Sequence, residues 1–208
     1  MLLTHGPAIA SPKRDGGAEE DERMGKRSLA RVLVVDVEAT CWDGTPPPGQ
    51  VNEIIEIGLC VLDTATLERG ERRAILVRPE RSEVSAFCTE LTTLTAEDVA
   101  SGLSFVDACA VLREEYGASG LVWASYGDYD RKQFQRQCES TGAKYPFGPR
   151  HINVKTLFAL AHNLKSEVGM DRAIGLAGLS LEGTHHRGVD DAWNIAALLA
   201  GLLRPSRG

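Results

Sequence analysis

The stretch Val34-Val35-Asp36-Val37-Glu38-Ala39-Thr40-Cys41 places two acidic residues inside an apolar run, and it decides which fold and chemistry to expect. Its β-branched residues favour a strand. Because side chains alternate between the two faces of a strand, Asp36 and Glu38 would lie on the same face. Two buried carboxylates on one face repel each other unless a cation lies between them, and carboxylate oxygens suit Mg²⁺ or Mn²⁺. The alternative is a solvated strand end that carries two acids by chance.

The composition fits one globular domain with a tail. The chain has 208 residues, of which 43% are hydrophobic, and a domain usually takes roughly 100–200 residues. A net charge of −6 argues against the broad nucleic-acid binding of repressors or histones. It leaves open an enzyme that holds nucleic acid locally through metal ions. No apolar run approaches the ~20 residues of a membrane span, so no membrane association is expected.

The first 28 residues differ in composition from the rest. Residues 1–28 are rich in Gly, Pro and charge, and we expect a disordered tail there, followed by a folded domain at 29–208. No basic segment followed by an apolar core marks a signal peptide, and Met24 is a candidate alternative start. The five cysteines form no CxxC pair and are odd in number, which indicates reduced thiols and a cytoplasmic protein.

The order of the predicted elements is that of an α/β layer fold. Strands are expected at 31–37, 53–63, 72–77 and 121–124, and helices at 104–116, 129–140, 154–164, 172–179 and 189–203, with a helical turn from Thr95. The second and third strands are close in sequence and should form an antiparallel hairpin. The first and fourth should lie side by side and parallel. The first strand is then central, with Glu38 at the edge where open α/β sheets place their sites.

Two more acids follow the fourth expected strand. Asp128 is placed to cap the helix at 129–140. Asp130 would lie in the first turn of that helix and face back toward the sheet edge. A carboxylate there gains from the helix dipole whatever its function, so a structural role and a metal-binding role both fit Asp130.

A third acidic cluster follows a loop that contains histidines. The segment Gly183-Thr184-His185-His186-Arg187-Gly188-Val189-Asp190-Asp191-Ala192 runs into the last apolar helix. Its glycines allow a close approach to another backbone or to a ligand. If Asp190 caps the helix, Asp191 is left to project toward the sheet. His186, five residues before Asp191, could then reach solvent and substrate as a general base; His185 and Asp190 have the same spacing.

Taken together, the five candidate residues fit a hydrolytic site with two metal ions: Asp36, Glu38, Asp130, Asp191 and His186. In such sites, two divalent ions about 3.5–4 Å apart clamp the attacking and leaving oxygens of a displacement at phosphorus. Four acids supply the negative charge that holds both ions. A histidine with a pKa near neutrality can remove the proton from the attacking water.

These residues also resemble the motifs of the DEDDh-type 3′-to-5′ exonucleases of the RNase H-like superfamily. The first motif matches Asp36-Val37-Glu38-Ala39-Thr40-Cys41-Trp42, and the second, an aromatic residue followed by Asp, matches Tyr129-Asp130. The third, a histidine, four residues and then Asp-Ala, matches the run from His186 to Ala192 and favours His186 over His185. The resemblance covers about residues 31–203. It implies a mixed five-stranded sheet flanked by helices.

One branch of that family is especially similar. The runs from Ser125 to Asp130 and from Phe87 to Thr92 resemble the branch of the histone-mRNA and RNA-interference 3′ exonucleases and the bacterial KapD-like proteins. Carried over from that branch, four residues would bind two Mg²⁺ or Mn²⁺ ions and His186 would be the general base; the four are Asp36, Glu38, Asp130 and Asp191. Eukaryotic members add a SAP domain, which residues 1–28 are too short to hold, so stem-loop binding is not expected.

Several residues are candidates for substrate contact. Backbone groups of Ala39 and Thr40 could meet the terminal ribose. Phe87 lies in the segment that resembles the family's terminal-base pocket and could stack on a base, or it could belong to the core. A basic set could follow the phosphates or form a solvated helix face: Arg131, Lys132, Arg136, Lys144, Arg150 and Lys155. The last helix offers residues for the core or for a homodimer contact: Trp193, Leu198, Leu199, Leu202 and Leu203.

The leading hypothesis is a metal-dependent 3′-to-5′ exonuclease that acts on single-stranded nucleic acid, with RNA favoured over DNA. One alternative is a binding or regulatory module that keeps the fold without turnover. Another is an exonuclease specific for DNA, which the 2′-hydroxyl would distinguish. The presence of all five catalytic positions argues against the module without turnover.

Overall fold

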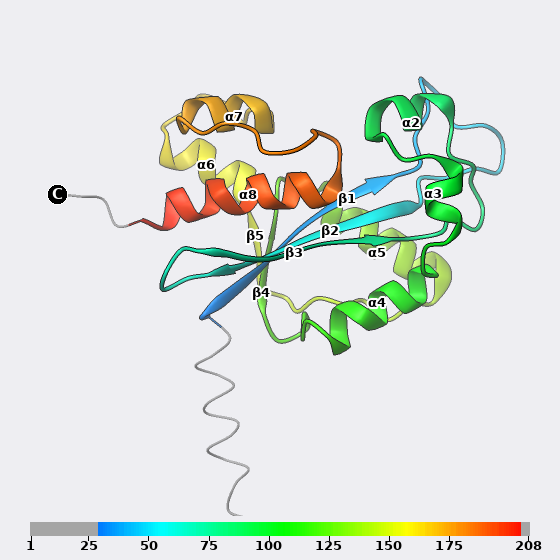
Figure 1. Cartoon of the computed structure of the whole chain (residues 1–208), viewed down its shortest axis with the longest axis horizontal. Helices are drawn as coiled ribbons and strands as arrows, with labels where there is room; N and C mark the ends of the chain where they lie inside the picture. Colours follow the sequence, from blue (N-terminus) through cyan, green and yellow to red (C-terminus); the bar gives the residue numbers. More distant parts are fainter. Residues whose placement is uncertain (1–28, 205–208) are drawn as a thin grey trace, which may run out of the picture.

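A computed structural model describes residues 29–204, and its centre is a mixed five-stranded sheet flanked by helices (Figure 1). The strands are β1 (Arg31–Ala39), β2 (Ile54–Asp63), β3 (Arg69–Leu76), β4 (Val122–Ser125) and β5 (His151–Asn153), in the spatial order β3-β2-β1-β4-β5. The β2–β3 hairpin is antiparallel, and β1 is central and parallel to β4, as predicted. The tail predicted for residues 1–28 lies outside the described residues.

The helices are α2 (Ala86–Thr92), α3 (Ala96–Ala100), α4 (Phe105–Glu114), α5 (Tyr129–Thr141), α6 (Val154–Ala161), α7 (Met170–Leu176) and α8 (Gly188–Leu203). The predicted helices are present with shifted ends, but two elements were not predicted from the sequence pattern. The strand β5 has only three residues. The helix α2 is one short segment that Ser85 caps through a hydrogen bond from the Cys88 N–H and that ends at Thr93, with φ of 63°. Neither is long enough to show a hydrophobic period.

The side chains of β1 separate two halves of the core. Leu33 and Val35 pack with residues of α4 and α5 on one face of the sheet, and Val32 and Val34 pack with α6, α7 and α8 on the other (Figure 1). Burying each of these aliphatic side chains contributes about 1.5–3 kcal/mol. The row of Val32 and Val34 continues into Asp36 and Glu38 because alternate residues share a face. The two acids therefore emerge on the side of the sheet that carries α8.

The first turn of α8 rests directly on the sheet because two glycines meet there. A Cβ atom on Gly58 of β2 would lie 1.9 Å from the main-chain carbonyl carbon and oxygen of Gly188. A Cβ on Gly188 would lie 3.1 Å from the carbonyl oxygen of Asp36. The close approach expected at Gly188 is confirmed, and it carries Asp191 toward the end of β1.

One predicted helix cap, Asp190, is wrong, and the other, Asp128, is confirmed in position but makes no capping bond. Asp128 stands at the N-cap of α5, but its side chain makes no capping bond and pairs with Arg131 at 2.9 Å. Its φ and ψ of −106° and −2° differ from the extended conformation in which a capping side chain reaches the helix. Asp190 lies inside the first turn of α8, and its carboxylate accepts a hydrogen bond from the Thr184 N–H at 2.7 Å. Ser104, by contrast, caps α4 as predicted.

The remaining features of the fold agree with a reduced, globular chain. Each of the five cysteines lies in the described range and is a free thiol. Leu198 and Leu199 are buried in the core, and Leu203 is exposed. Within residues 29–204, no helix combines the length and apolar character that a bilayer crossing requires. The possible homodimer contact of α8 stays a prediction.

Candidate active site

A cleft of about 280 Å³ opens where β1 ends, and the predicted acids line it. Candidate ligand atoms of Asp36, Glu38 and Asp191 all lie within 4.8 Å of one another. Asp130 lines the same cleft from the first turn of α5. Four acids that are up to 155 positions apart in the sequence therefore converge at one end of the sheet.

Asp130 binds a part of β1 that extends beyond the end of the shorter strand β4. The ladder of β1 and β4 ends at Val34 and Ala124, so the next N–H groups on that edge of β1 have no strand partner there. The Val37 N–H instead donates to Oδ1 of Asp130 at 3.0 Å. Asp130 is almost fully buried. The bond holds the carboxylate of Asp130 against β1, at the wall of the cleft.

The histidine loop contacts Asp191 through both of its histidines, in different ways. The main-chain N–H of His186 donates to Oδ2 of Asp191 at 3.0 Å, and Nδ1 of His185 lies 3.1 Å from the same oxygen. The two imidazole rings stack with their centres 4.0 Å apart, and both residues line the cleft. His186 has φ of 64°, a left-handed conformation that is uncommon outside glycine. The ring that touches Asp191 is thus that of His185.

Burial raises the pKa of every acid in the cluster, and repulsion by neighbouring carboxylates adds to it at Asp36, Glu38 and Asp130. Burial, followed by the charges of Asp191 and Glu56, raises the pKa of Glu38 to about 8. Burial raises the pKa of Asp130 to about 6, and burial with the neighbouring carboxylates raises that of Asp36 well above its ordinary value. Such groups favour their charged form again when a cation is bound among them. The donor set and its excess of negative charge therefore fit divalent metal ions with oxygen ligands.

A buried ion pair that the sequence reasoning missed holds the histidine loop. The carboxylate of Glu56 on β2 is fully buried and accepts hydrogen bonds from Nη2 of Arg187 at 3.0 Å and Nε at 3.2 Å. It also accepts the Gly188 N–H at 2.8 Å, which satisfies a donor at the start of α8. The signal in the sequence was an acid inside the apolar strand Ile54–Asp63. Glu56 thereby fixes the backbone on the C-terminal side of His186.

Thr40 and Ala39, the two residues predicted to meet the ribose, are both buried. Thr40 is fully buried, and its hydroxyl donates to the Val51 carbonyl at 3.0 Å and accepts the Glu53 N–H at 2.9 Å. Its main-chain N–H donates to the Glu53 carbonyl at 2.8 Å, so these groups hold the loop after β1. Ala39 is buried too. The ribose contact predicted for Ala39 and Thr40 stays a prediction that these bonds do not favour.

Two aromatic residues remain candidates for stacking. Phe87 on α2 is 38% exposed, so the alternative that it belongs to the core is wrong, but it does not line the cleft of the acids. Tyr129 is 50% exposed and does line that cleft. The sequence reasoning used Tyr129 only as part of a motif. Its place as the first residue of α5, directly before Asp130, was the signal for a contact with substrate.

The expected basic stripe does not form as a continuous surface. Arg131 pairs with Asp128, and Arg150 donates to the Gly120 carbonyl at 2.7 Å. Lys155 lines the cleft of the acids, and Arg136 lines a separate hollow. Lys132 and Lys144 are exposed and line neither site, so the basic residues do not form one surface.

Comparison with known proteins agrees with this geometry. A family model described as Exonuclease (RNase T) matches residues 33–199. The chain belongs to this family. It is 31% identical to human 3′-5′ exoribonuclease 1 over 183 residues, which cover 83% of this chain and 52% of the human protein. It is 27% identical to the 3′-5′ exonuclease Snipper of Drosophila melanogaster, over 95% of this chain and 78% of the fly protein.

A solved structure supports the same assignment. The nuclease domain of 3′hExo, a DEDDh family member bound to rAMP, superposes with a TM-score of 0.76 at 28% identity, over 83% of this chain and 90% of that one. The DEDDh resemblance and the mixed sheet between helices are thus confirmed. Because the chain spans about half the length of human 3′-5′ exoribonuclease 1, the activity of the whole relative is not transferred with the family.

Proposed function

We propose that this chain is a metal-dependent 3′-to-5′ exonuclease that hydrolyses single-stranded RNA from its 3′ end. The observation that carries the proposal is the convergence of Asp36, Glu38, Asp130 and Asp191 around one cleft, within the DEDDh family. RNA is favoured because the human relative is named an exoribonuclease and the similar nuclease domain binds rAMP.

The acids hold the metal ions and the histidine loop moves a proton. Asp36 and Glu38 offer carboxylate oxygens from β1, Asp191 from α8 and Asp130 from α5. When bound, two divalent ions supply charge neutralisation at the phosphorus and activation of the attacking water. The carboxylates of the chain keep those charges in place and exclude bulk water by their burial.

His186 is the proposed general base. Burial and the neighbouring His185 lower its pKa, so its ring is neutral at physiological pH and can accept a proton from water. The ring faces the cleft, while its main-chain N–H is tied to Asp191. His185, whose ring already contacts Asp191, is better placed to orient that carboxylate than to receive a proton.

The proposal is tested with an RNA oligomer labelled at its 5′ end. Wild-type protein with Mn²⁺ or Mg²⁺ should produce a ladder that shortens from the 3′ end, and EDTA should abolish it. A matched DNA oligomer tests the DNA-specific alternative, since only the 2′-hydroxyl differs. Binding of the RNA without any metal-dependent shortening would favour the module without turnover and contradict the proposal.

A further inference from the structure

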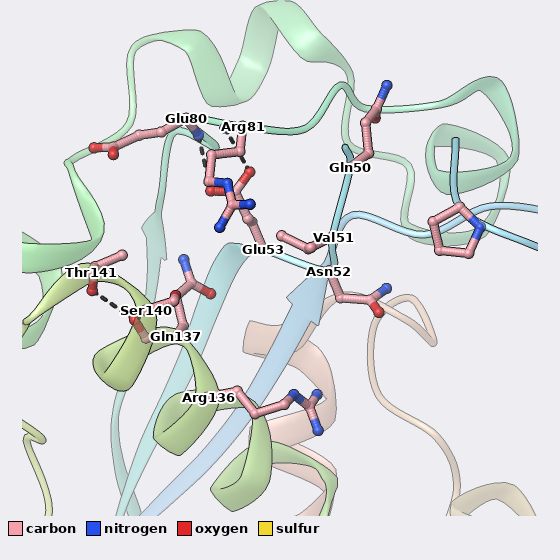
Figure 2. A pocket seen from close by; sticks show the side chains of 11 residues that line it. Gln50, Val51, Asn52, Glu53, Glu80, Arg81, Arg136, Gln137, Ser140 and Thr141 are labelled. Atoms are coloured by element: carbon pink, nitrogen blue, oxygen red, sulfur yellow. Dashed lines mark hydrogen bonds between the residues drawn. The ribbon is translucent and has the colours of Figure 1, made fainter. Parts of the chain in front are cut away.

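We propose that a hollow beside α5, separate from the cleft of the acids, is a subsite for an upstream nucleotide of the RNA strand. The inference rests on the proposed exonuclease function. The hollow has a volume of about 370 Å³ and is walled by the loop of residues 46–53, by Glu80 and Arg81 after β3, and by the second half of α5 (Figure 2). None of its lining residues lines the catalytic cleft.

The walls of this hollow are held by hydrogen bonds that are buried or partly buried. The Glu53 carboxylate accepts the N–H groups of Glu80 at 3.2 Å and Arg81 at 2.8 Å. Ser82 accepts the Val51 N–H at 2.9 Å. The Ile54 N–H donates to Oε1 of Gln137 at 2.8 Å, which joins the loop to α5. The shape is therefore built into the fold, and a ligand would meet it already formed.

The hollow presents hydrogen-bond donors and positive charge. Gln137 is only 4% exposed; its Oε1 is occupied, and Figure 2 shows its amide nitrogen directed into the hollow. Within residues 29–204, that nitrogen has no acceptor. Arg81 and Arg136 line the hollow, and neither forms an ion pair with a carboxylate of the described chain. The Glu80 carboxylate points away from the hollow in the same view.

These groups match one nucleotide of a single strand. Guanidinium groups bind phosphate through paired N–H donors, and amides bind the edges of unstacked bases. The carboxylate of Glu53 keeps its negative charge, but its two oxygens accept the main-chain N–H groups of Glu80 and Arg81, so the guanidinium groups are the ones left to meet a phosphate. A small anion alone would leave most of a volume of about 370 Å³ empty.

The hollow also lies on the path that leads to the catalytic cleft. Tyr129 of the cleft and Arg136 of the hollow are seven residues apart on α5, which puts them on the same side of the helix, ~10 Å apart along its axis. The loop wall joins the first motif through Nδ2 of Asn52, which donates to the Thr40 carbonyl at 2.6 Å. A strand whose 3′ end is in the cleft can therefore place an upstream nucleotide beside Arg136.

The test compares substrates that do and do not reach the hollow. The double variant Arg81→Ala/Arg136→Ala is assayed with a dinucleotide and a decamer of riboadenylate in Mn²⁺. The variant loses the charge-assisted hydrogen bonds to the upstream phosphate, so the ratio of kcat/KM for decamer over dinucleotide should fall at least about tenfold. The loss should come from KM, because these contacts are remote from the reacting phosphate.

The control is Arg113→Ala. Arg113 lies on α4 and donates to the Lys144 carbonyl outside both sites. Its substitution removes one positive charge, as each substitution of the double variant does, and should leave the ratio unchanged. Equal losses on both substrates, or an unchanged ratio in the double variant, would overturn the subsite while the exonuclease stands. Wild-type protein that cleaves neither oligomer would contradict the proposed function and the subsite with it.

Discussion

The cleft and the hollow lie at the same end of the sheet, yet they differ in charge: acids predominate in the cleft, and acids and arginines are equal in number in the hollow. The cleft gathers Asp36, Glu38, Asp130 and Asp191. Within residues 29–204, the charge that lowers the pKa of Glu38 is that of Arg187, which Glu56 already binds. The hollow carries two arginines that no described carboxylate pairs. The cleft therefore needs cations, whereas the hollow, whose lining also includes Glu53 and Glu80, offers guanidinium groups to an anion without a net excess of charge.

A single-stranded RNA with divalent ions satisfies both needs at once. Its terminal phosphodiester would meet the metal-loaded acids, and an upstream phosphate would meet the arginines. This arrangement explains how a chain with a net charge of −6 can hold a polyanion without a broad basic surface.

The largest effect is expected from Asp36→Ala, which removes an acid at the centre of the cleft. Metal ions supply several kcal/mol of transition-state stabilisation, and each 1.36 kcal/mol is tenfold, so cleavage should fall by about 10³-fold or more. The free energy of unfolding without metal should not fall, because one source of repulsion is gone. Cleavage assays and calorimetric Mn²⁺ titration check both statements. Retained activity would contradict the assignment of Asp36 as a metal-binding residue.

The next effect separates the two histidines. His186→Ala should reduce kcat by about 10²–10⁴-fold, the usual contribution of a general base. His185→Ala should reduce it far less, because that ring contacts Asp191 rather than the reacting water. Single-turnover rates at saturating RNA measure the chemical step. The reverse ranking would assign the base to His185, the ring that the structure places against the acid.

A third prediction tests the contact that forms the cleft. Gly58→Ala would force a Cβ into the main chain of Gly188 and move the first turn of α8, so the free energy of unfolding should drop by ~3 kcal/mol or more. Metal affinity should weaken too, since Asp191 is carried by that turn. The control Gly201→Ala lies in the same helix with nothing within 4 Å and should be neutral or stabilising. Equal effects of both variants on urea unfolding would contradict this account.

The sequence predicted most of the fold because the strong patterns were long. β1 is nine residues long and α8 is sixteen, and both are largely apolar. The spacing of Asp36 and Glu38 placed both acids on the correct face of the sheet. Short elements such as β5 and α2 follow from the surrounding structure and have no period to read.

The sequence was least informative where partners are distant. Glu56 and Arg187 are 131 positions apart, and their ion pair depends on the sheet having formed. The backbone groups of Thr40 were predicted to meet a ribose, but its N–H donates to the Glu53 carbonyl and its carbonyl accepts from Asn52, partners that lie beyond the Pro46-Pro47-Pro48 loop. The capping bonds assigned to Asp128 and Asp190 failed for a local reason, because Arg131 and the Thr184 N–H, both nearby in sequence, bind these carboxylates instead.

The smallest effect is the pH dependence of the free energy of unfolding without metal, which reports the repulsion among the cleft acids when no cation is bound. The pKa of Glu38 is about 8 in the folded chain and ~4.3 when unfolded, so from about pH 6.5 to 8 the folded state binds more protons. The free energy of unfolding in EDTA should therefore fall as pH rises through this window. The histidines with lowered pKa act in the opposite sense only below about pH 6.5, where their unfolded forms take up protons.

Thermal unfolding in EDTA should show the decline in stability as pH rises, and Mn²⁺ should remove it by binding the deprotonated acids. Glu38→Gln should flatten the dependence without metal; a slope unchanged in that variant would mean that the repulsion in the cleft does not centre on Glu38.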